Sequence, residues 1–83
     1  MNIVLSPLAV RKYKRIGTKE RPKVNRKIDL LSKNPFLGKA LQGEYKGIYS
    51  LRAWPLRIIY TFDPPEQIIQ IVDIDYRGDV YKN

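Results

Sequence analysis

The sequence predicts a small α+β domain in which an N-terminal strand and a helical hairpin pack on one face of an antiparallel-rich sheet of about four strands. Apolar residues recur with a helical period up to Pro35, and from Leu41 onward the period changes to two. A chain of 83 residues has room for one hydrophobic core only. Residues 1–83 are therefore expected to form a single domain.

The first elements are a strand and a basic helix. Residues 2–5, "NIVL", have the composition of a strand. Ser6 is a good N-cap and Pro7 suits the first helical position, so we expect a helix to begin there and to end at Gly17. Basic residues fill much of its remaining surface, whereas helical spacing puts three residues on one core-facing stripe: Ala9, Tyr13 and Ile16.

A second helix is expected between Thr18, its cap, and Pro35. The helix should stop before Pro35 because the residue that precedes proline disfavours helical backbone angles. Apolar residues again share one face, at Val24, Ile28 and Leu31. The two helices therefore form a hairpin that covers the sheet.

Three strands in meander order complete the domain: residues 47–53, 56–62 and 67–74, separated by Trp54-Pro55 and by residues 63–66. The strand at residues 2–5 is free to pair at an edge or between the later strands. In the middle strand of the meander, alternation predicts that Arg57 faces away from the helices. The same alternation directs a large apolar set into the core: Leu56, Ile58, Tyr60 and Phe62.

The turn at Trp54-Pro55 is unusual for a hairpin. A two-residue hairpin loop normally needs positive φ angles, which Pro55 cannot adopt and Trp54 would resist. Two alternatives remain open: a loop longer than two residues, or a cis Trp54-Pro55 peptide in a type VI turn.

If the strands flanking this turn pair, Arg52 and Arg57 lie directly opposite each other on one face. Like charges in that position repel, and a bound phosphate would offset the repulsion. In the alternative interpretation, each arginine lies over the sheet and pairs with a carboxylate of Asp73, Asp75 or Asp79.

The end of the chain, "DYRGDVYKN", adds Arg77, Tyr76 and Tyr81 near the same sheet. Guanidinium groups bind phosphate as planar forks, and aromatic rings stack on bases. Trp54 is either a further stacking platform or an ordinary exposed turn residue. An arginine cluster with interleaved aromatics thus predicts a polyanion site.

The composition narrows the class of function. Sixteen Lys and Arg against eight Asp and Glu give a net charge of +8, which favours an anionic partner, either nucleic acid or an acidic protein. With no cysteine and no histidine, thiolate and imidazole metal sites are excluded, and no cofactor is expected. The N-terminus lacks a basic segment before its apolar residues, and no apolar run has the length of a membrane span. We expect a cytoplasmic protein that does not contact membranes.

The stretch "LQGEYKGIYSLRAWPLRIIYTFD", followed by "IVDIDYRGDVYKN", resembles the RelE/ParE superfamily of bacterial and archaeal type II toxins. The helical hairpin before it also fits that family. The resemblance implies a RelE-like fold and a toxin that an acidic, co-expressed antitoxin neutralises. For the RelE branch it implies an endoribonuclease that cleaves mRNA on the ribosome and inhibits translation. The alternatives are a ParE-like inhibitor of DNA gyrase and a degenerate relative that only binds its antitoxin.

The resemblance also implies roles for individual residues. Arg57 matches the strand arginine that stabilises the scissile phosphate, and Tyr81 matches a tyrosine that stacks on the target base and takes part in proton transfer. Arg77 matches the arginine of the closing element and completes the catalytic set. The expected RNA-binding residues are Arg52, Lys46, Tyr76 and Trp54.

The chain departs from the family pattern at two places. Ile48 and Ser50 stand where RelE-type nucleases carry lysines, and Tyr76 stands where many relatives have histidine. Cleavage of RNA by its own 2′-hydroxyl needs a base, a cation and an acid. The sequence supplies cations and a tyrosine, and it leaves the general base unassigned.

Overall fold

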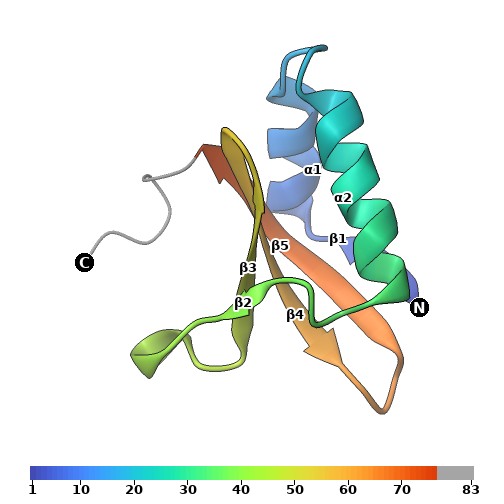
Figure 1. The fold of residues 1–83 in the computed structure, drawn as a ribbon, viewed down its shortest axis with the longest axis vertical. Helices are drawn as coiled ribbons and strands as arrows, with labels where there is room; N and C mark the ends of the chain where they lie inside the picture. Colours follow the sequence, from blue (N-terminus) through green and yellow to red (C-terminus); the bar gives the residue numbers. More distant parts are fainter. Residues whose placement is uncertain (77–83) are drawn as a thin grey trace.

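The computed structural model describes residues 1–76. The described residues form two helices and five strands, and apart from the additional short strand β2 they follow the predicted order (Figure 1). Their bounds are β1 (Asn2–Leu5), α1 (Pro7–Arg15), α2 (Arg21–Lys33), β2 (Lys39–Ala40), the 3₁₀ turn η1 (Gly43–Tyr45), β3 (Ile48–Ala53), β4 (Leu56–Asp63) and β5 (Ile68–Tyr76).

The strands form one mixed sheet in the order β1-β5-β4-β3-β2. β1 runs parallel to β5 at one edge, and the other neighbours are antiparallel. The α+β prediction is confirmed, and the first strand takes the edge position that the sequence left open. The prediction of about four strands missed β2, because two residues are too few to show a periodic pattern.

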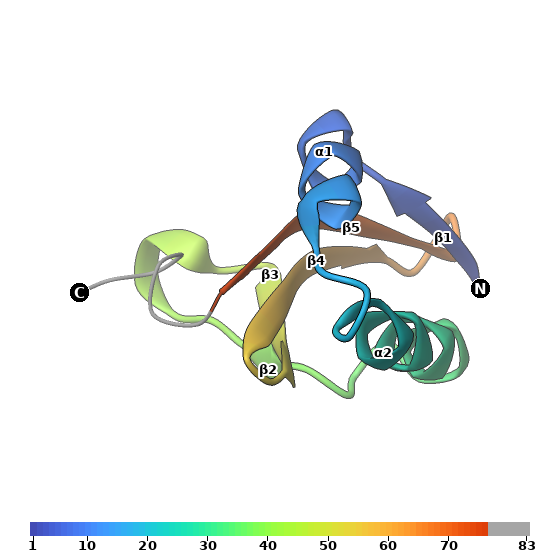
Figure 2. The same cartoon turned by 90° about the horizontal axis from the view of Figure 1, so that it is seen from above.

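Both helices lie on one side of the sheet (Figures 1 and 2). α1 packs mainly on β5, and α2 packs on β3 and β1. The apolar stripes of the helices meet the inner face of the sheet as predicted, with Tyr13 and Ile28 partly buried at the margin. The buried cluster contains Ala9, Ile16, Val24, Leu31, Leu51, Ala53, Leu56, Ile58, Tyr60, Ile69, Ile71 and Ile74.

The helix boundaries follow local capping chemistry. Ser6 caps α1 as predicted, and its side chain accepts a hydrogen bond from the Ala9 N–H at 3.0 Å. The prediction that Thr18 caps α2 is wrong, because α2 begins at Arg21 after a turn and its N-cap is Glu20. Pro22 explains the shift, since proline is favoured in the first turn of a helix and fixes where that turn begins. Neither described helix is long and apolar enough to cross a membrane.

The β3–β4 hairpin turns at Trp54-Pro55, and this peptide bond is cis. Of the two alternatives that the sequence left open, the structure therefore has the cis peptide. The strands continue directly from the turn, with Ala53 paired to Leu56. The register of the hairpin, which positions the two arginines, is thus the predicted one.

The outer face of the sheet, away from the helices, is only partly open. Arg57 is half-buried and Arg52 is exposed there, whereas Ile59 is fully buried and Ser50 is 9% exposed. A sheet that helices cover on one side only would be expected to leave this whole face accessible. The outer face is accessible to solvent at the arginine end of the hairpin and is buried at the centre of the sheet.

Tyr60 ties the segment after α2 to the sheet. Its hydroxyl donates to the Pro35 carbonyl at 2.7 Å and accepts from the Gly38 N–H at 2.9 Å, and its ring stacks on Tyr49. A Cβ on residue 38 would lie 2.6 Å from the Tyr60 Oη, so this close approach requires glycine. The next residue along the chain is Lys39, the first residue of β2.

Candidate nucleic-acid interface

Arg52 and Arg57 are direct cross-strand partners in the β3–β4 hairpin. Side chains at directly opposite positions of an antiparallel pair share a face, with their Cβ atoms about 5 Å apart. The predicted opposition of two guanidinium groups is therefore confirmed.

A groove of about 520 Å³ contains both arginines. Among the residues that the structure describes, four of its lining side chains are cations and none is a carboxylate. We call it the basic groove, and its lining residues are Lys27, Leu37, Lys39, Leu41, Ser50, Leu51, Arg52 and Arg57. Its chemistry, a positive lining with apolar side chains between the cations, fits a flexible anionic chain better than a compact neutral ligand.

The groove exists because β3 is longer than its outer neighbour. β2 pairs with β3 only at Tyr49 and Ser50, so no described strand covers the edge of β3 beyond Ser50. At this open edge, side chains of both sheet faces border the same space, which is why inward-facing Leu51 and outward-facing Arg52 both line it. α2 closes one side of the groove with Lys27, and β2 closes the other with Lys39.

The alternative in which Asp73 or Asp75 neutralises the arginines is not what the structure has. Lys12 of α1 binds both carboxylates instead, at 3.3 Å to Asp73 and 2.7 Å to Asp75. Within residues 1–76 neither Arg52 nor Arg57 forms an ion pair, and the buried Nε of Arg57 has no hydrogen-bond partner. The third carboxylate of that alternative, on Asp79, lies outside the described residues.

We call Lys12 and the two carboxylates that it binds the Lys12 cluster, and the contacts within it shift pKa values. Partial burial works against the charged form of Asp75, but the hydrogen bonds from Lys12 and from the Tyr76 N–H outweigh it and lower the pKa of this carboxyl. The hydrogen bond to Asp75 is also the main cause that raises the pKa of Lys12, against partial desolvation. The Asp75 carboxylate is thus held as an anion at the edge of β5.

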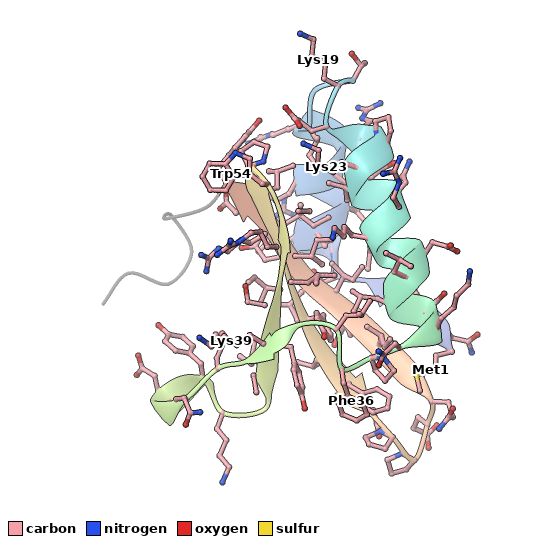
Figure 3. All side chains as sticks on the ribbon, in the orientation of Figure 1. Met1, Lys19, Lys23, Phe36, Lys39 and Trp54 are labelled. Carbon is pink, nitrogen blue, oxygen red and sulfur yellow. The ribbon has the colours of Figure 1, made fainter. Side chains whose placement is uncertain are left out.

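The other predicted RNA-binding residues lie apart from the basic groove. Trp54 is 53% exposed at the tip of the hairpin, where its carbonyl accepts a hydrogen bond from the Lys23 Nζ at 2.7 Å (Figure 3). Lys46 is exposed and precedes β3, at the opposite end of that strand from Arg52. Neither residue lines the groove.

Tyr76 lies on the helix-facing side. It is the cross-strand partner of inward-facing Leu56 and lines a smaller pocket of about 230 Å³ with Lys12 and Arg15 of α1. The structure therefore separates Tyr76 from the arginine pair. The predicted catalytic residues Arg77 and Tyr81 lie outside the described residues, so their positions stay predictions.

Two cations of the groove, Lys27 and Lys39, were not predicted. Lys27 follows Val24 by three residues and precedes Leu31 by four, which places it beside the buried stripe of α2. That spacing is a usable signal for a lysine that borders the core. Lys39 belongs to the two-residue strand β2 and gave no signal.

The described groove supplies charge rather than proton transfer. The part of its lining that residues 1–76 supply contains cations, a serine and leucines, and no carboxylate or imidazole. Arginine and lysine side chains bind phosphate oxygens and stabilise charge that develops on phosphorus. Among residues 1–76, the groove therefore holds an electrostatic clamp and no candidate general base.

Comparisons with known proteins agree on one superfamily. The family model described as "ParE toxin of type II toxin-antitoxin system, parDE" matches residues 3–81. Toxin RelG of Mycobacterium tuberculosis is 34% identical over 53 residues, which cover 63% of this chain and 61% of RelG. The match thus spans less than two thirds of the length of that relative.

Solved structures share the fold. The toxin–antitoxin complex RelBE2 of Mycobacterium tuberculosis superposes with a TM-score of 0.84 at 24% identity, over 92% of this chain and 96% of that one. The YoeB–YefM complex of Staphylococcus aureus gives a TM-score of 0.76 at 28% identity, over 93% of this chain and 97% of that one. Because the family model covers nearly the whole sequence, the chain belongs to the ParE toxin family of type II toxin–antitoxin systems, within the RelE/ParE superfamily.

Proposed function

We propose that this toxin is an endoribonuclease that cleaves mRNA on the ribosome and thereby inhibits translation. The observation that carries the proposal is the basic groove, in which four cations converge and the described lining contains no carboxylate. RNA presents a phosphate at every nucleotide, so a groove of this charge suits a single-stranded segment. The proposed substrates place the toxin in the cytoplasm.

The arginine pair is the part of the groove best suited to a phosphodiester. Arg52 and Arg57 repel each other across the hairpin, and a phosphate between them would replace that repulsion by two attractive contacts. The planar fork of a guanidinium group can bind two phosphate oxygens at once, which the point charge of an ammonium group does not do in a fixed geometry. In the proposal, Arg57 holds the scissile phosphate and Arg52, Lys27 and Lys39 hold its neighbours.

Cleavage then follows the chemistry of RNA itself. The 2′-oxygen forms a bond to phosphorus as its proton leaves to a base, and the bond to the 5′-oxygen breaks as that oxygen takes up a proton. Negative charge accumulates on the phosphorane oxygens, where Arg57 would act. The family resemblance assigns the remaining roles: Arg77 assists this stabilisation, and Tyr81 stacks on the base and transfers a proton.

An acidic antitoxin is the proposed regulatory partner. The similar structures include complexes of RelE-like or YoeB toxins with antitoxins. A chain of charge +8 with an open basic groove attracts an acidic segment, and such a segment laid over the groove would exclude RNA. One contact thus neutralises charge and blocks the site.

Inhibition of DNA gyrase is the second candidate, favoured by the ParE description of the matching family model. Within residues 1–76 the groove has no carboxylate or imidazole in its lining, which fits a toxin that binds a protein without cutting RNA. The two candidates differ in what happens to transcripts when the toxin is expressed.

The test is induction of the toxin alone in a bacterial host, with transcript 5′ ends mapped within minutes. The variants are Arg57→Ala and Tyr81→Phe, and the matched control is Lys14→Ala, which removes an exposed cation of α1 outside the groove. We expect new ends within translated codons for the wild type and the control, and none for the two variants. Thermal unfolding of purified proteins checks that each variant is folded.

Each other outcome rejects the proposal in a distinct way. Growth arrest without new 5′ ends, together with loss of gyrase supercoiling activity, would replace it by the second candidate. Arrest with new ends that persist in both variants would show that the groove is not the active site. No arrest at all would leave a relative that only binds its antitoxin.

A further inference from the structure

A carboxylate stands beside the proposed phosphate-binding arginine without binding it. Asp75 of β5 is the direct cross-strand partner of Arg57, on the side opposite Arg52. Such partners share a sheet face, with Cβ atoms about 5 Å apart, so the carboxylate is within reach of the guanidinium group. An Arg57–Asp75 ion pair is the contact that this register would ordinarily produce.

Lys12 takes that carboxylate instead. Its Nζ lies 2.7 Å from one oxygen of Asp75, while the other oxygen accepts the Tyr76 N–H at 2.8 Å. The same Nζ lies 3.3 Å from Asp73, whose Oδ1 also accepts the Ile74 N–H at 2.8 Å. Both carboxylates are therefore turned toward α1 and the edge of β5.

The topology brings Lys12 to that edge. β1 pairs with β5 only as far as Leu5 and Ile71, so from Val72 onward no described strand covers the edge of β5 that faces away from β4. The start of α1 is fixed on β5 because the Ser6 N–H donates to the Ile71 carbonyl at 2.9 Å and the Ser6 hydroxyl donates to the Val72 carbonyl at 2.7 Å. Between one and two helical turns further along α1, Lys12 reaches around the open edge from the helix layer.

We propose that Lys12 is a positioning residue that holds the carboxylates of Asp73 and Asp75 away from Arg57, so that the Arg57 guanidinium stays available for an RNA phosphate. The inference rests on the proposed function, since it concerns the availability of the same groove. Lys12 itself does not line the basic groove. It acts through Asp75, and its loss would let a carboxylate neutralise one of the four groove cations.

A double-mutant cycle separates this role from that of an ordinary salt bridge. The proteins are the wild type, Lys12→Met, Asp75→Asn and the double variant, and the probe is a short single-stranded RNA measured by fluorescence anisotropy at fixed salt. Methionine keeps most of the apolar stem of lysine and removes its charge. Lys14→Met, which removes an exposed cation of the same helix, is the control for net charge.

We expect Lys12→Met to weaken RNA binding about tenfold and Lys14→Met to weaken it about twofold at most, since only the first releases a carboxylate onto Arg57. When Lys12 is present, Asp75→Asn should change RNA affinity little, because Lys12 already holds the carboxylate. In the Lys12→Met background, the same substitution should restore RNA affinity. An equal effect of Asp75→Asn on RNA binding in both backgrounds would overturn the inference. It would show that Asp75 affects binding only through its long-range charge, whether or not Lys12 is present.

The Nε–H resonance of Arg57 gives a second readout that needs no RNA and no Lys12 variant. In an otherwise wild-type chain, Asp75→Asn should leave the chemical shift of this resonance unchanged, because the Asp75 carboxylate binds Lys12 and not Arg57. A large shift on that substitution would mean that Asp75 already binds Arg57, which contradicts the inference. If the wild type fails to bind RNA while this resonance behaves as expected, the proposed function fails, whereas the conclusion that Asp75 leaves the Arg57 guanidinium unpaired stands.

Discussion

Arg52 and Arg57 face each other across the β3–β4 hairpin, and within residues 1–76 neither has a carboxylate partner. Opposed like charges destabilise a sheet by a few tenths of a kcal/mol to about 1 kcal/mol. The opposed arginines therefore lower the stability of the fold, and they concentrate positive charge at the place where the proposed function needs it to bind phosphate. The first two predictions follow from that relation.

Removing one of the two charges should stabilise the protein. Arg52 is exposed, so Arg52→Gln loses little packing and relieves the repulsion, and we expect the free energy of unfolding to rise by about 0.5 kcal/mol at low salt. The gain should shrink in 0.5 M salt, because mobile ions screen the repulsion that the substitution removes. Urea unfolding at both salt concentrations measures it, with Lys14→Gln as the control. A loss of stability at low salt would show that Arg52 has a stabilising contact.

The same charges should determine the salt dependence of RNA binding. Each phosphate contact lowers the slope of log K against log salt by about 0.7 for a single strand, so four groove cations contribute about −3. Lys27→Ala and Lys39→Ala should each make the slope less negative by about 0.7, as should Arg57→Ala. Lys14→Ala should leave the slope nearly unchanged. Equal effects of all four substitutions would mean that RNA binds the whole basic surface without using the groove.

The hairpin and its arginine pair were predictable because period two and a two-residue connection determine which residues face each other. Helix starts were predictable only in part: Ser6 caps α1, but Pro22 moved the start of α2 past Thr18. β2 is too short to leave a pattern, so its Lys39 was missed.

The contacts of Lys12 could not be predicted from the sequence for a different reason. Lys12 and Asp75 are 63 residues apart, and their meeting depends on how far β1 pairs along β5 and where Ser6 attaches α1. The sequence offered Asp73, Asp75 and Asp79 alike as partners for the two arginines, and the structure makes Asp75 the cross-strand neighbour of Arg57. Only the docking of the helix decides between the two cations.

The Lys12 cluster should make stability depend on acidity. The folded-state pKa of Asp75 is lowered, so its contribution is present above the unfolded value of about 4 and is lost as the pH falls through the folded value. We therefore expect Asp75→Asn to cost about 1 kcal/mol at pH 7 and progressively less below pH 4. The pKa of Lys12 is raised, so its contribution is lost only as the pH rises above about 10.5.

Urea unfolding of the wild type and of Asp75→Asn at several pH values measures this difference. The control is Asp29→Asn, because Asp29 forms a solvent-exposed bridge to Lys33 at 3.5 Å. Exposed bridges contribute little, so that variant should differ only slightly from the wild type at every pH. A constant deficit for Asp75→Asn from pH 7 to pH 3 would show that its carboxylate matters for reasons other than charge.

The approach of Gly38 to Tyr60 should make residue 38 intolerant of a side chain. A Cβ there would meet the Tyr60 Oη at 2.6 Å, the Tyr60 Cε1 at 2.8 Å and the Ser50 carbonyl at 3.0 Å. Gly38→Ala should therefore lower the free energy of unfolding by about 2 kcal/mol or more, since both the hydroxyl contacts and the packing of a buried ring must shift. Gly17→Ala is the matched control: nothing lies within 4 Å of its Cβ position, so it should be neutral or slightly stabilising.

Tyr60→Phe completes the argument about this contact. On its own it leaves the Pro35 carbonyl and the Gly38 N–H without their hydroxyl partner, at an expected cost of about 1–3 kcal/mol. In the double variant with Gly38→Ala, Tyr60→Phe removes the closest clash but leaves the ring carbon 2.8 Å from the new Cβ. The loss of stability in the double variant should therefore be smaller than the sum of the two single losses. The double variant should still be less stable than the wild type. Because Pro35 and Gly38 position Lys39, both substitutions should also weaken RNA binding to the folded protein. Strict additivity of the two stability costs would show that the hydroxyl and the Cβ do not compete for the same space.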